Sequence, residues 1–230
     1  MITDNYREIR RKIDEACRRV GRDPEDVLLV AVSKTKPEED IQTLYDSGVR
    51  DFGENYIQEL KQKMEDLPGD IRWHMIGHLQ RNKVKYIASR VSMIHAVDTL
   101  ELAKTIEKEG TKNNRVIPVL IEVNVAGEDT KFGVAPEETE SLIRQIAGLP
   151  HVHVEGLMTS APYVTDAECN RSVFAQLKQL SVDIEQKNID NTCMHVLSMG
   201  MTNDYEIAVE EGSTMVRVGT AIFGERDYSK

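Results

Sequence analysis

Short apolar runs alternate with longer amphipathic stretches along the whole chain. A short apolar run is typical of a buried strand, and apolar residues three or four positions apart are typical of a helix. The apolar runs predict eight strands, at 26–33, 49–53, 71–77, 91–97, 116–125, 152–158, 193–198 and 214–218. The amphipathic stretches predict helices at 3–20, 37–47, 55–66, 99–109, 136–147 and 166–187.

Regular alternation of strands and helices indicates the α/β class with a parallel sheet whose faces are covered. Eight such units predict a closed (β/α)8 barrel, a TIM barrel preceded by an extra N-terminal helix, and 230 residues is a plausible length for it. A doubly wound open sheet is the alternative. Because no Gly/Ser/Pro-rich linker or internal repeat interrupts the pattern, we expect one domain over residues 1–230.

Three helix starts have recognisable chemistry. Pro37 fits the first turn of a helix, where its missing N–H costs nothing. The pairs Asn55 with Gln58 and Asn203 with Glu206 have the spacing of capping boxes. We therefore expect helices to begin at these positions.

The composition limits the classes of partner. Apolar residues make up 40% and charged residues 30% of the chain, which is an ordinary globular balance. The 39 acidic residues outnumber the 29 basic ones, so the formal net charge is −10. This excess argues against a protein that binds nucleic acid or an anionic membrane. An anionic small ligand would need a local positive pocket.

Cysteine usage and the apolar runs indicate the compartment. Cys17, Cys169 and Cys193 form no CxxC motif and no disulfide framework, so a reducing compartment is expected. No apolar segment typical of a signal peptide follows Met1. The longest aliphatic run, 27–32, is far too short to span a bilayer. We expect a cytoplasmic protein.

Several common functional motifs are missing. The chain contains no GxGxxG dinucleotide fingerprint, no phosphate-binding P-loop and no GxSxG nucleophile elbow. His74 and His78 are four residues apart, but no HExxH motif or cysteine cluster completes a zinc site. We therefore expect no bound metal.

Polar residues at the predicted strand ends are the candidates for chemistry, because barrel active sites lie there. Lys34 follows the aliphatic run of the first strand. Burial, or a neighbouring cation such as Lys36, would free its amine to form a Schiff base. The alternative is that Lys34 extends from the barrel rim into water.

The last two strands offer a cation and small residues. Arg217 is a charge inside an apolar strand and needs a partner or ligand, the alternative being an ion pair with a carboxylate of a neighbouring strand, for example Glu122. Glycines and hydroxyls at 198–200 and 219–220 could bind a phosphate, as barrels often do at strands seven and eight. Ordinary turns are the alternative. A Schiff-base lysine and a phosphate site are what pyridoxal 5′-phosphate (PLP) requires.

Six blocks of sequence resemble the pyridoxal phosphate homeostasis protein family, single-domain proteins similar to the N-terminal barrel of alanine racemase. The blocks are residues 31–37, 52–56, 73–83, 156–158, 197–202 and 216–224. The resemblance implies that Lys34 holds PLP as a Schiff base, that Arg217 faces the pyridine nitrogen and that Asn55 lies beside the cofactor. It also implies that the phosphate is received by Ser198, Gly200, Gly219 and Thr220. It assigns no role to His78 or Lys131.

The resemblance also bears on catalysis. A cationic Arg217 disfavours protonation of the ring nitrogen, which weakens PLP as an electron sink. Racemases of this type take an acid–base tyrosine from a second domain, and we expect none here because the sequence ends at Lys230, soon after the eighth predicted strand.

We therefore expect a monomeric PLP carrier in intracellular PLP homeostasis, acting indirectly on amino-acid and keto-acid metabolism without efficient catalysis. PLP-dependent apoenzymes are its expected protein partners, with no nucleic acid and no membrane. The alternatives are a PLP-dependent amino-acid racemase of low or specialised activity and a Schiff-base aldolase acting on a sugar phosphate.

Overall fold

The strands of the protein form a closed barrel in the computed structural model, which describes residues 1–128 and 130–225. Neighbouring strands are parallel and follow the order of the sequence, and the last strand pairs with the first. This confirms the predicted (β/α)8 barrel and excludes the open sheet. The strands are β1 (Leu28–Val32), β2 (Asp51–Glu54), β3 (Arg72–Met75), β4 (Met93–Val97), β5 (Ile117–Glu122), β6 (Val152–Met158), β7 (Thr192–Ser198) and β8 (Met215–Val218).

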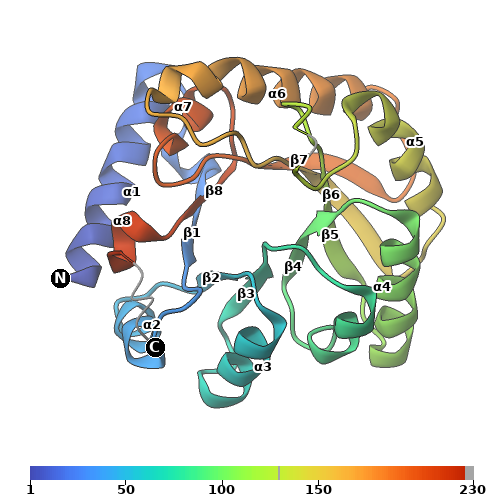
Figure 1. The fold of residues 1–230 in the computed structure, drawn as a ribbon, viewed down its shortest axis with the longest axis horizontal. Coiled ribbons are helices and arrows are strands. Elements are labelled where there is room, and N and C mark those ends of the chain that lie inside the picture. The colour runs from blue at the N-terminus through green and yellow to red at the C-terminus, as the bar shows by residue number, and fades with distance from the viewer. Residues whose placement is uncertain (129, 226–230) are drawn as a thin grey trace.

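Helices surround the barrel, and the extra N-terminal helix α1 packs against α7 and α8 beside β8 and β1 (Figure 1). The connection from β3 to β4 contains the 3₁₀ segment η2 (Arg81–Tyr86) in the position of a helix. None of the helices in the described ranges is long and apolar enough to cross a membrane. The helices are α1 (Ile2–Arg19), α2 (Glu38–Asp46), α3 (Ile57–Asp66), α4 (Leu100–Asn113), α5 (Pro136–Ile146), α6 (Arg171–Glu185), α7 (Tyr205–Glu210) and α8 (Thr220–Phe223).

Both faces of the sheet are buried, as expected for a parallel barrel. The main core lies between strands and helices and includes the fully buried Phe52 and Trp73. A smaller apolar cluster of Ala96, Leu120 and Met158 is separate from it. Polar side chains are also buried within the barrel, among them His74, His95, Ser198 and Arg217.

The predicted capping boxes are wrong. Helix α3 begins after Tyr56 and α7 begins after Asp204, and neither N-cap side chain makes a capping hydrogen bond. The Asp204 carboxylate accepts the Met201 N–H at 2.7 Å, outside the helix. Pro37 is the N-cap residue of α2, so this helix begins one residue later than expected. Asn55 therefore lies in the connection between β2 and α3 with its side chain available for another purpose.

Candidate functional site

A cavity of about 810 Å³ lies at the C-terminal end of the barrel. Its wall comes from segments far apart in the sequence, because all the strands point the same way and their carboxyl ends meet there. Five residues expected from the sequence line it together: Lys34, Asn55, Arg217, Gly219 and Thr220. Two others, Ser198 and Gly200, are buried beneath the wall and do not line it.

Lys34 directly follows β1, is half-buried and lines this cavity. The backbone on both sides of it is held by hydrogen bonds. On one side, the Ser33 carbonyl accepts a hydrogen bond from the Lys63 ammonium at 2.8 Å. On the other side, the Thr35 N–H donates to Glu59 Oε1 at 2.7 Å. Thr35 has a φ of +60°, which is unfavourable for a β-branched residue. The hydrogen bond to Glu59 thus supports a strained turn next to Lys34.

The centre of this support is a buried ion-pair network, which we call the Lys63 clamp: Ser33, Glu54, Glu59 and Lys63. Lys63 Nζ lies 2.7 Å from Glu54 Oε1 and 2.5 Å from Glu59 Oε1. Ser33 Oγ donates to the same Glu54 oxygen at 2.6 Å. Burial raises the pKa of Glu54, and the Lys63 ammonium opposes that shift. The clamp fixes where the chain turns into the cavity, so it positions Lys34.

The clamp was missed by the sequence analysis, although a signal was present. Lys63 falls on the face of α3 that carries the buried Ile57, Leu60 and Met64. A lysine on such a face is buried at considerable cost unless carboxylates neutralise it. That pattern predicts a paired lysine, but it does not identify Glu54 as the partner.

Lys36 binds backbone carbonyls on the opposite side of the cavity rim. Its ammonium donates to the carbonyl oxygens of Phe223, Gly224 and Glu225 at 3.2, 3.0 and 2.7 Å. These bonds tie the turn after β1 to the segment around the end of α8. The contacts make Lys36 a cross-link of the cavity rim.

Arg217 on β8 is only 4% exposed and reaches the cavity from below. Its Nη1 donates to Ser198 Oγ at 2.6 Å, and its Nη2 donates to the Thr159 carbonyl at 3.0 Å. In the part of the chain that the structure describes, no ion pair joins Arg217 to Glu122 or to another carboxylate, so the alternative of a direct ion pair is wrong. Burial lowers the pKa of Arg217 to about 10, against the opposing fields of Glu122 and Asp204. The guanidinium is still charged at neutral pH.

A hydrogen-bond chain continues from Arg217 through the barrel interior. Ser198 Oγ lies 3.0 Å from His95 Nδ1, and His95 Nε2 lies 3.0 Å from His74 Nδ1. His74 Nε2 lies 3.1 Å from the Asp51 carboxylate. We call this series, Arg217–Ser198–His95–His74–Asp51, the interior chain. It connects the cavity to a carboxylate that also binds Arg72 at 2.8 Å.

The chemistry of the groups sets part of the bonding direction in the interior chain. A carboxylate only accepts, so His74 donates from Nε2 to Asp51. Burial, with His74 and Arg217 nearby, holds the pKa of His95 well below its ordinary value, so this ring is neutral. A neutral imidazole donates from one nitrogen and accepts at the other, so His95 donates to one of His74 and Ser198 and accepts from the other. The Ser198 oxygen accepts from Arg217.

The interior chain gives Ser198 contacts that the sequence did not predict. Its hydroxyl is enclosed, hydrogen-bonds with His95 and accepts from Arg217, so it orients the guanidinium. His95 was not singled out from the sequence, although it interrupts the apolar strand β4 as Arg217 interrupts β8. Gly200 has a φ of +94°, and a Cβ there would lie 2.6 Å from the Ala208 side chain. Close packing against α7 thus accounts for this glycine.

Asn55 supplies an unused polar atom. Its Oδ1 is buried and has no hydrogen-bond partner in the described residues. The backbone around it is approached closely by Gly77, where a Cβ would lie 2.8 Å from the Asn55 carbonyl oxygen. Since buried oxygens are normally paired, Asn55 Oδ1 is a candidate acceptor for a bound molecule.

Two residues without an expected role help to shape the cavity. Lys131 donates to the carbonyls of Ser160 and Ala161 at 3.2 and 3.0 Å and pairs with Glu128 at 3.2 Å. His78 stacks on Phe132, with the ring centroids 4.0 Å apart and the planes at 15°. Both contacts hold the segment after β5 against neighbouring loops.

Comparison with known proteins agrees with this geometry. The family model described as "Alanine racemase, N-terminal domain" matches residues 2–227. A protein of Aquifex aeolicus named "Pyridoxal phosphate homeostasis protein" is 46% identical over 218 residues, which cover 94% of this chain and 95% of that protein. The protein of the same name from Escherichia coli K12 is 38% identical over 240 residues, covering 100% and 98%.

Solved structures give the same result. PipY from Synechococcus elongatus, solved with PLP bound, is 31% identical, with a TM-score of 0.84 and coverage of 97% of this chain and 100% of that one. A Bifidobacterium adolescentis protein described as unknown is 35% identical, with a TM-score of 0.92 and coverage of 96% and 94%. Alanine racemase from Clostridium difficile shares the fold at 17% identity and a TM-score of 0.73, with coverage of 99% of this chain and 58% of that one. The chain belongs to the alanine racemase N-terminal domain family and, within it, to the pyridoxal phosphate homeostasis proteins.

Proposed function

We propose that this protein binds PLP through a Schiff base on Lys34 and acts in intracellular PLP homeostasis, and thereby indirectly in amino-acid and keto-acid metabolism. One observation carries the proposal. The lysine, the arginine, the unpartnered asparagine and the Gly219–Thr220 turn line a single cavity. Relatives named for PLP homeostasis, and PipY with PLP bound, support it.

The cavity fits the chemical groups of PLP. Its volume of about 810 Å³ is in the range of small-molecule sites, about 300–1,000 Å³. Four cationic side chains line it against three carboxylates, a small local excess of positive charge in a chain of net charge −10: Lys34, Lys36, Lys131 and Arg217 against Glu128, Asp204 and Glu225. An anionic phosphate therefore finds attraction there although the whole molecule repels it. The buried Asn55 Oδ1 offers an acceptor to a donor on the ligand.

Each residue has a separate task in this proposal. Lys34 supplies the amine, and the Lys63 clamp holds that amine at the cavity entrance. The Gly219 backbone and the Thr220 hydroxyl receive the phosphate, and Gly200 supports that wall from below. Arg217 faces the ring nitrogen and keeps its own proton, because its pKa of about 10 is well above neutral pH. Ser198 acts through Arg217.

A carrier role is favoured over racemisation. PLP supplies an electron sink when it is bound, but the Arg217 cation opposes protonation of the ring nitrogen that would strengthen this sink. Racemisation also needs a second acid–base group in a fixed position. Among the described residues that line the cavity, the one tyrosine is Tyr163, which is 84% exposed. No packing holds it as such a group.

The proposal extends to where the protein works and what receives the cofactor. We place it in the cytoplasm as a monomer that delivers PLP to PLP-dependent apoenzymes. Its three cysteines are free, which suits a reducing compartment. Restoration of apoenzyme activity by the loaded protein, faster than by free PLP at the same concentration, tests delivery. Sedimentation velocity tests the monomer.

Borohydride reduction after incubation with PLP tests the site itself. We expect visible absorbance, a single labelled peptide containing Lys34, and loss of both in Lys34→Ala. The matched control is Lys61→Ala, an exposed lysine of α3, which should be labelled like the wild type. A colourless protein, or a label on another side chain, would contradict the proposal.

Turnover separates the carrier from the racemase. We expect no detectable racemisation across a panel of D- and L-amino acids. Rates typical of enzymes, about 1–10³ per second, would contradict the carrier hypothesis and favour the racemase hypothesis.

A further inference from the structure

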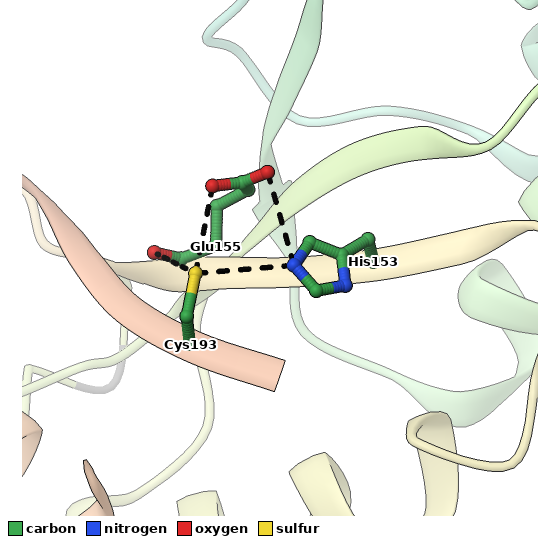
Figure 2. Close-up of side chains that lie close together, drawn as sticks. All are labelled: His153, Glu155 and Cys193. Carbon is green, nitrogen blue, oxygen red and sulfur yellow. Dashed lines mark hydrogen bonds and ion pairs between the residues drawn. The ribbon is translucent and has the colours of Figure 1, made fainter. Parts of the chain in front are cut away.

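Three potential metal ligands meet on neighbouring strands, near their N-terminal ends and away from the cavity. His153 and Glu155 project from β6, and Cys193 projects from β7 (Figure 2). Cys193 Sγ lies 3.8 Å from His153 Nε2 and 3.6 Å from Glu155 Oε2. His153 Nε2 lies 3.9 Å from Glu155 Oε1. All three side chains are partly exposed, so an ion could reach them.

The orientation of His153 is fixed from outside the cluster. Asn191 donates through Nδ2 to the Val152 carbonyl at 2.9 Å, and also to two other carbonyls, so its Oδ1 is the atom that faces His153. That oxygen lies 3.1 Å from His153 Nδ1. Nδ1 must therefore carry a hydrogen, which leaves Nε2 as the nitrogen whose lone pair a metal ion in the cluster would bind. Metal-bound histidines are oriented in this way by a second hydrogen bond.

The cluster has more acceptors than hydrogens. The thiol of Cys193 has one hydrogen, and it faces His153 Nε2, Glu155 Oε2 and, at 3.8 Å, the Glu155 carbonyl oxygen. It can satisfy only one of them. A separation of 3.9 Å between His153 Nε2 and Glu155 Oε1 is also too long for a hydrogen bond. Several lone pairs therefore point into a small volume that contains too few hydrogens to satisfy them. A bound cation would satisfy them.

The distances suit zinc. Bond lengths of about 2.0–2.3 Å to N, O and S, at tetrahedral angles, place the ligand atoms about 3.3–3.6 Å apart. Cys193 Sγ lies nearest to Glu155 Oε2, at 3.6 Å, whereas His153 Nε2 lies nearest to Oε1, at 3.9 Å. One ligand atom from each residue lies within 4.8 Å of the other two, so rotation of the side chains brings them to zinc-binding distances. Thiolate, imidazole and carboxylate together favour zinc over magnesium or calcium.

We propose that His153, Glu155 and Cys193 bind a divalent transition-metal ion of the zinc class, with a fourth position open to water. Binding would displace the thiol proton to solvent, and the thiolate would become a ligand. The ion would join β6 to β7 where their pairing shifts register between Val154 and Gly156. The site is independent of the PLP cavity.

Titration of the chelator-treated protein with Zn²⁺ and with Co²⁺ tests the site. We expect one ion per chain and a thiolate-to-cobalt charge-transfer band. Both should be lost in Cys193→Ser, and His153→Gln or Glu155→Gln should weaken binding by about tenfold or more. Asn191→Ala should weaken it by about 10–100-fold, because the imidazole loses its orientation. Cys169→Ser, an exposed cysteine elsewhere, should bind like the wild type.

Two controls keep the result interpretable. Circular dichroism without metal shows whether each variant is folded, and Cys193→Ala replaces Cys193→Ser if the latter is not. Lys34→Ala should bind zinc like the wild type, so failure of the PLP proposal leaves this test intact. Absence of stoichiometric binding, or binding unchanged in both Cys193→Ser and His153→Gln, would overturn the site and indicate adventitious ions only.

Discussion

Two cations are buried inside the same protein, and their surroundings differ. Lys63 is 3% exposed and touches two carboxylates, at 2.7 and 2.5 Å. Arg217 is 4% exposed and donates to a neutral hydroxyl and a neutral carbonyl. The charge of Lys63 is therefore balanced where it lies, whereas the charge of Arg217 is not balanced by direct contact.

The difference separates a structural cation from a binding cation. A paired buried charge holds its neighbours in one geometry, which is how the Lys63 clamp positions Lys34. An unpaired buried charge is unfavourable for folding and indicates a ligand that uses it. Burial of Arg217 lowers its pKa to about 10 because desolvation is not fully compensated. The positive electrostatic field of the guanidinium therefore extends into the cavity that Arg217 lines.

Removing the clamp cation should have the largest effect on stability. Lys63→Met leaves the fully buried Glu54 without its counter-charge. We expect a loss of about 3–5 kcal/mol in the free energy of unfolding, measured by urea denaturation. The double variant Lys63→Met/Glu54→Gln should recover part of it, because the carboxylate is gone.

Lys61→Met is the matched control for the clamp. Lys61 lies on the same helix, is 51% exposed and pairs only loosely with Glu65 at 3.4 Å. Its replacement should change stability by less than about 0.5 kcal/mol. If Lys63→Met lost no more than Lys61→Met, the clamp would not be a stabilising network.

Replacing Glu122 tests a buried carboxylate that interacts with Arg217 at long range, without an ion pair. Burial, the largest cause, and Asp98 raise the pKa of Glu122 to about 7, and Arg217 opposes them. For an acid whose pKa rises on folding, stability is fully present below the unfolded value near 4.5 and is lost as pH increases to about 7. Glu122→Gln removes this loss, so the variant should exceed the wild type by up to about 3 kcal/mol at pH 8.

The pH dependence distinguishes this effect from a general change. The gain of Glu122→Gln should shrink to less than about 0.5 kcal/mol at pH 4.5, where the folded carboxyl is protonated and the unfolded one is half protonated, and should vanish at lower pH. Glu101→Gln, an exposed position at the start of α4, should show no such dependence. A gain that is equal at pH 5 and pH 8 would mean that ionisation of Glu122 is not its source.

The barrel could be predicted from the sequence because its strands are continuous apolar runs and its helices have apolar faces. The residues at strand ends followed from that fold, which is why Lys34 and Arg217 were recognised. Capping failed as a guide, since a capping box needs local geometry that spacing does not fix. Asn55 had the spacing, but its side chain does not cap α3.

Contacts across the fold could not be predicted. The interior chain joins β2, β3, β4, β7 and β8, and which inward-facing residues meet depends on strand register and tilt. His153 and Cys193 are 40 positions apart and meet only because β6 and β7 are neighbours with a shifted register. Sequence spacing carries no information on such pairs.

Replacing Arg217 should affect stability less than replacing Lys63. Arg217→Met removes an unfavourable buried charge together with its hydrogen bonds to Ser198 and Thr159. These contributions oppose each other, so we expect a change within about 2 kcal/mol in either direction. The visible spectrum of the PLP-loaded protein should change, because the ring nitrogen loses its cationic neighbour. Arg7→Met, 73% exposed, is the control that should change neither quantity. A loss as large as that of Lys63→Met would erase the distinction between the two cations.

The smallest effect concerns the strained turn that the clamp supports. At Thr35, with φ of +60°, glycine avoids a steric cost that any side chain incurs, so Thr35→Gly should be more stable than Thr35→Ala by about 1 kcal/mol. At the exposed Thr43 of α2 the order should reverse, because alanine is favoured over glycine in a helix by about 1 kcal/mol. Urea denaturation of the four variants measures both differences. Alanine at least as stable as glycine at position 35 would mean that the turn before Pro37 is not strained, and that the clamp holds Lys34 by its ion pairs alone.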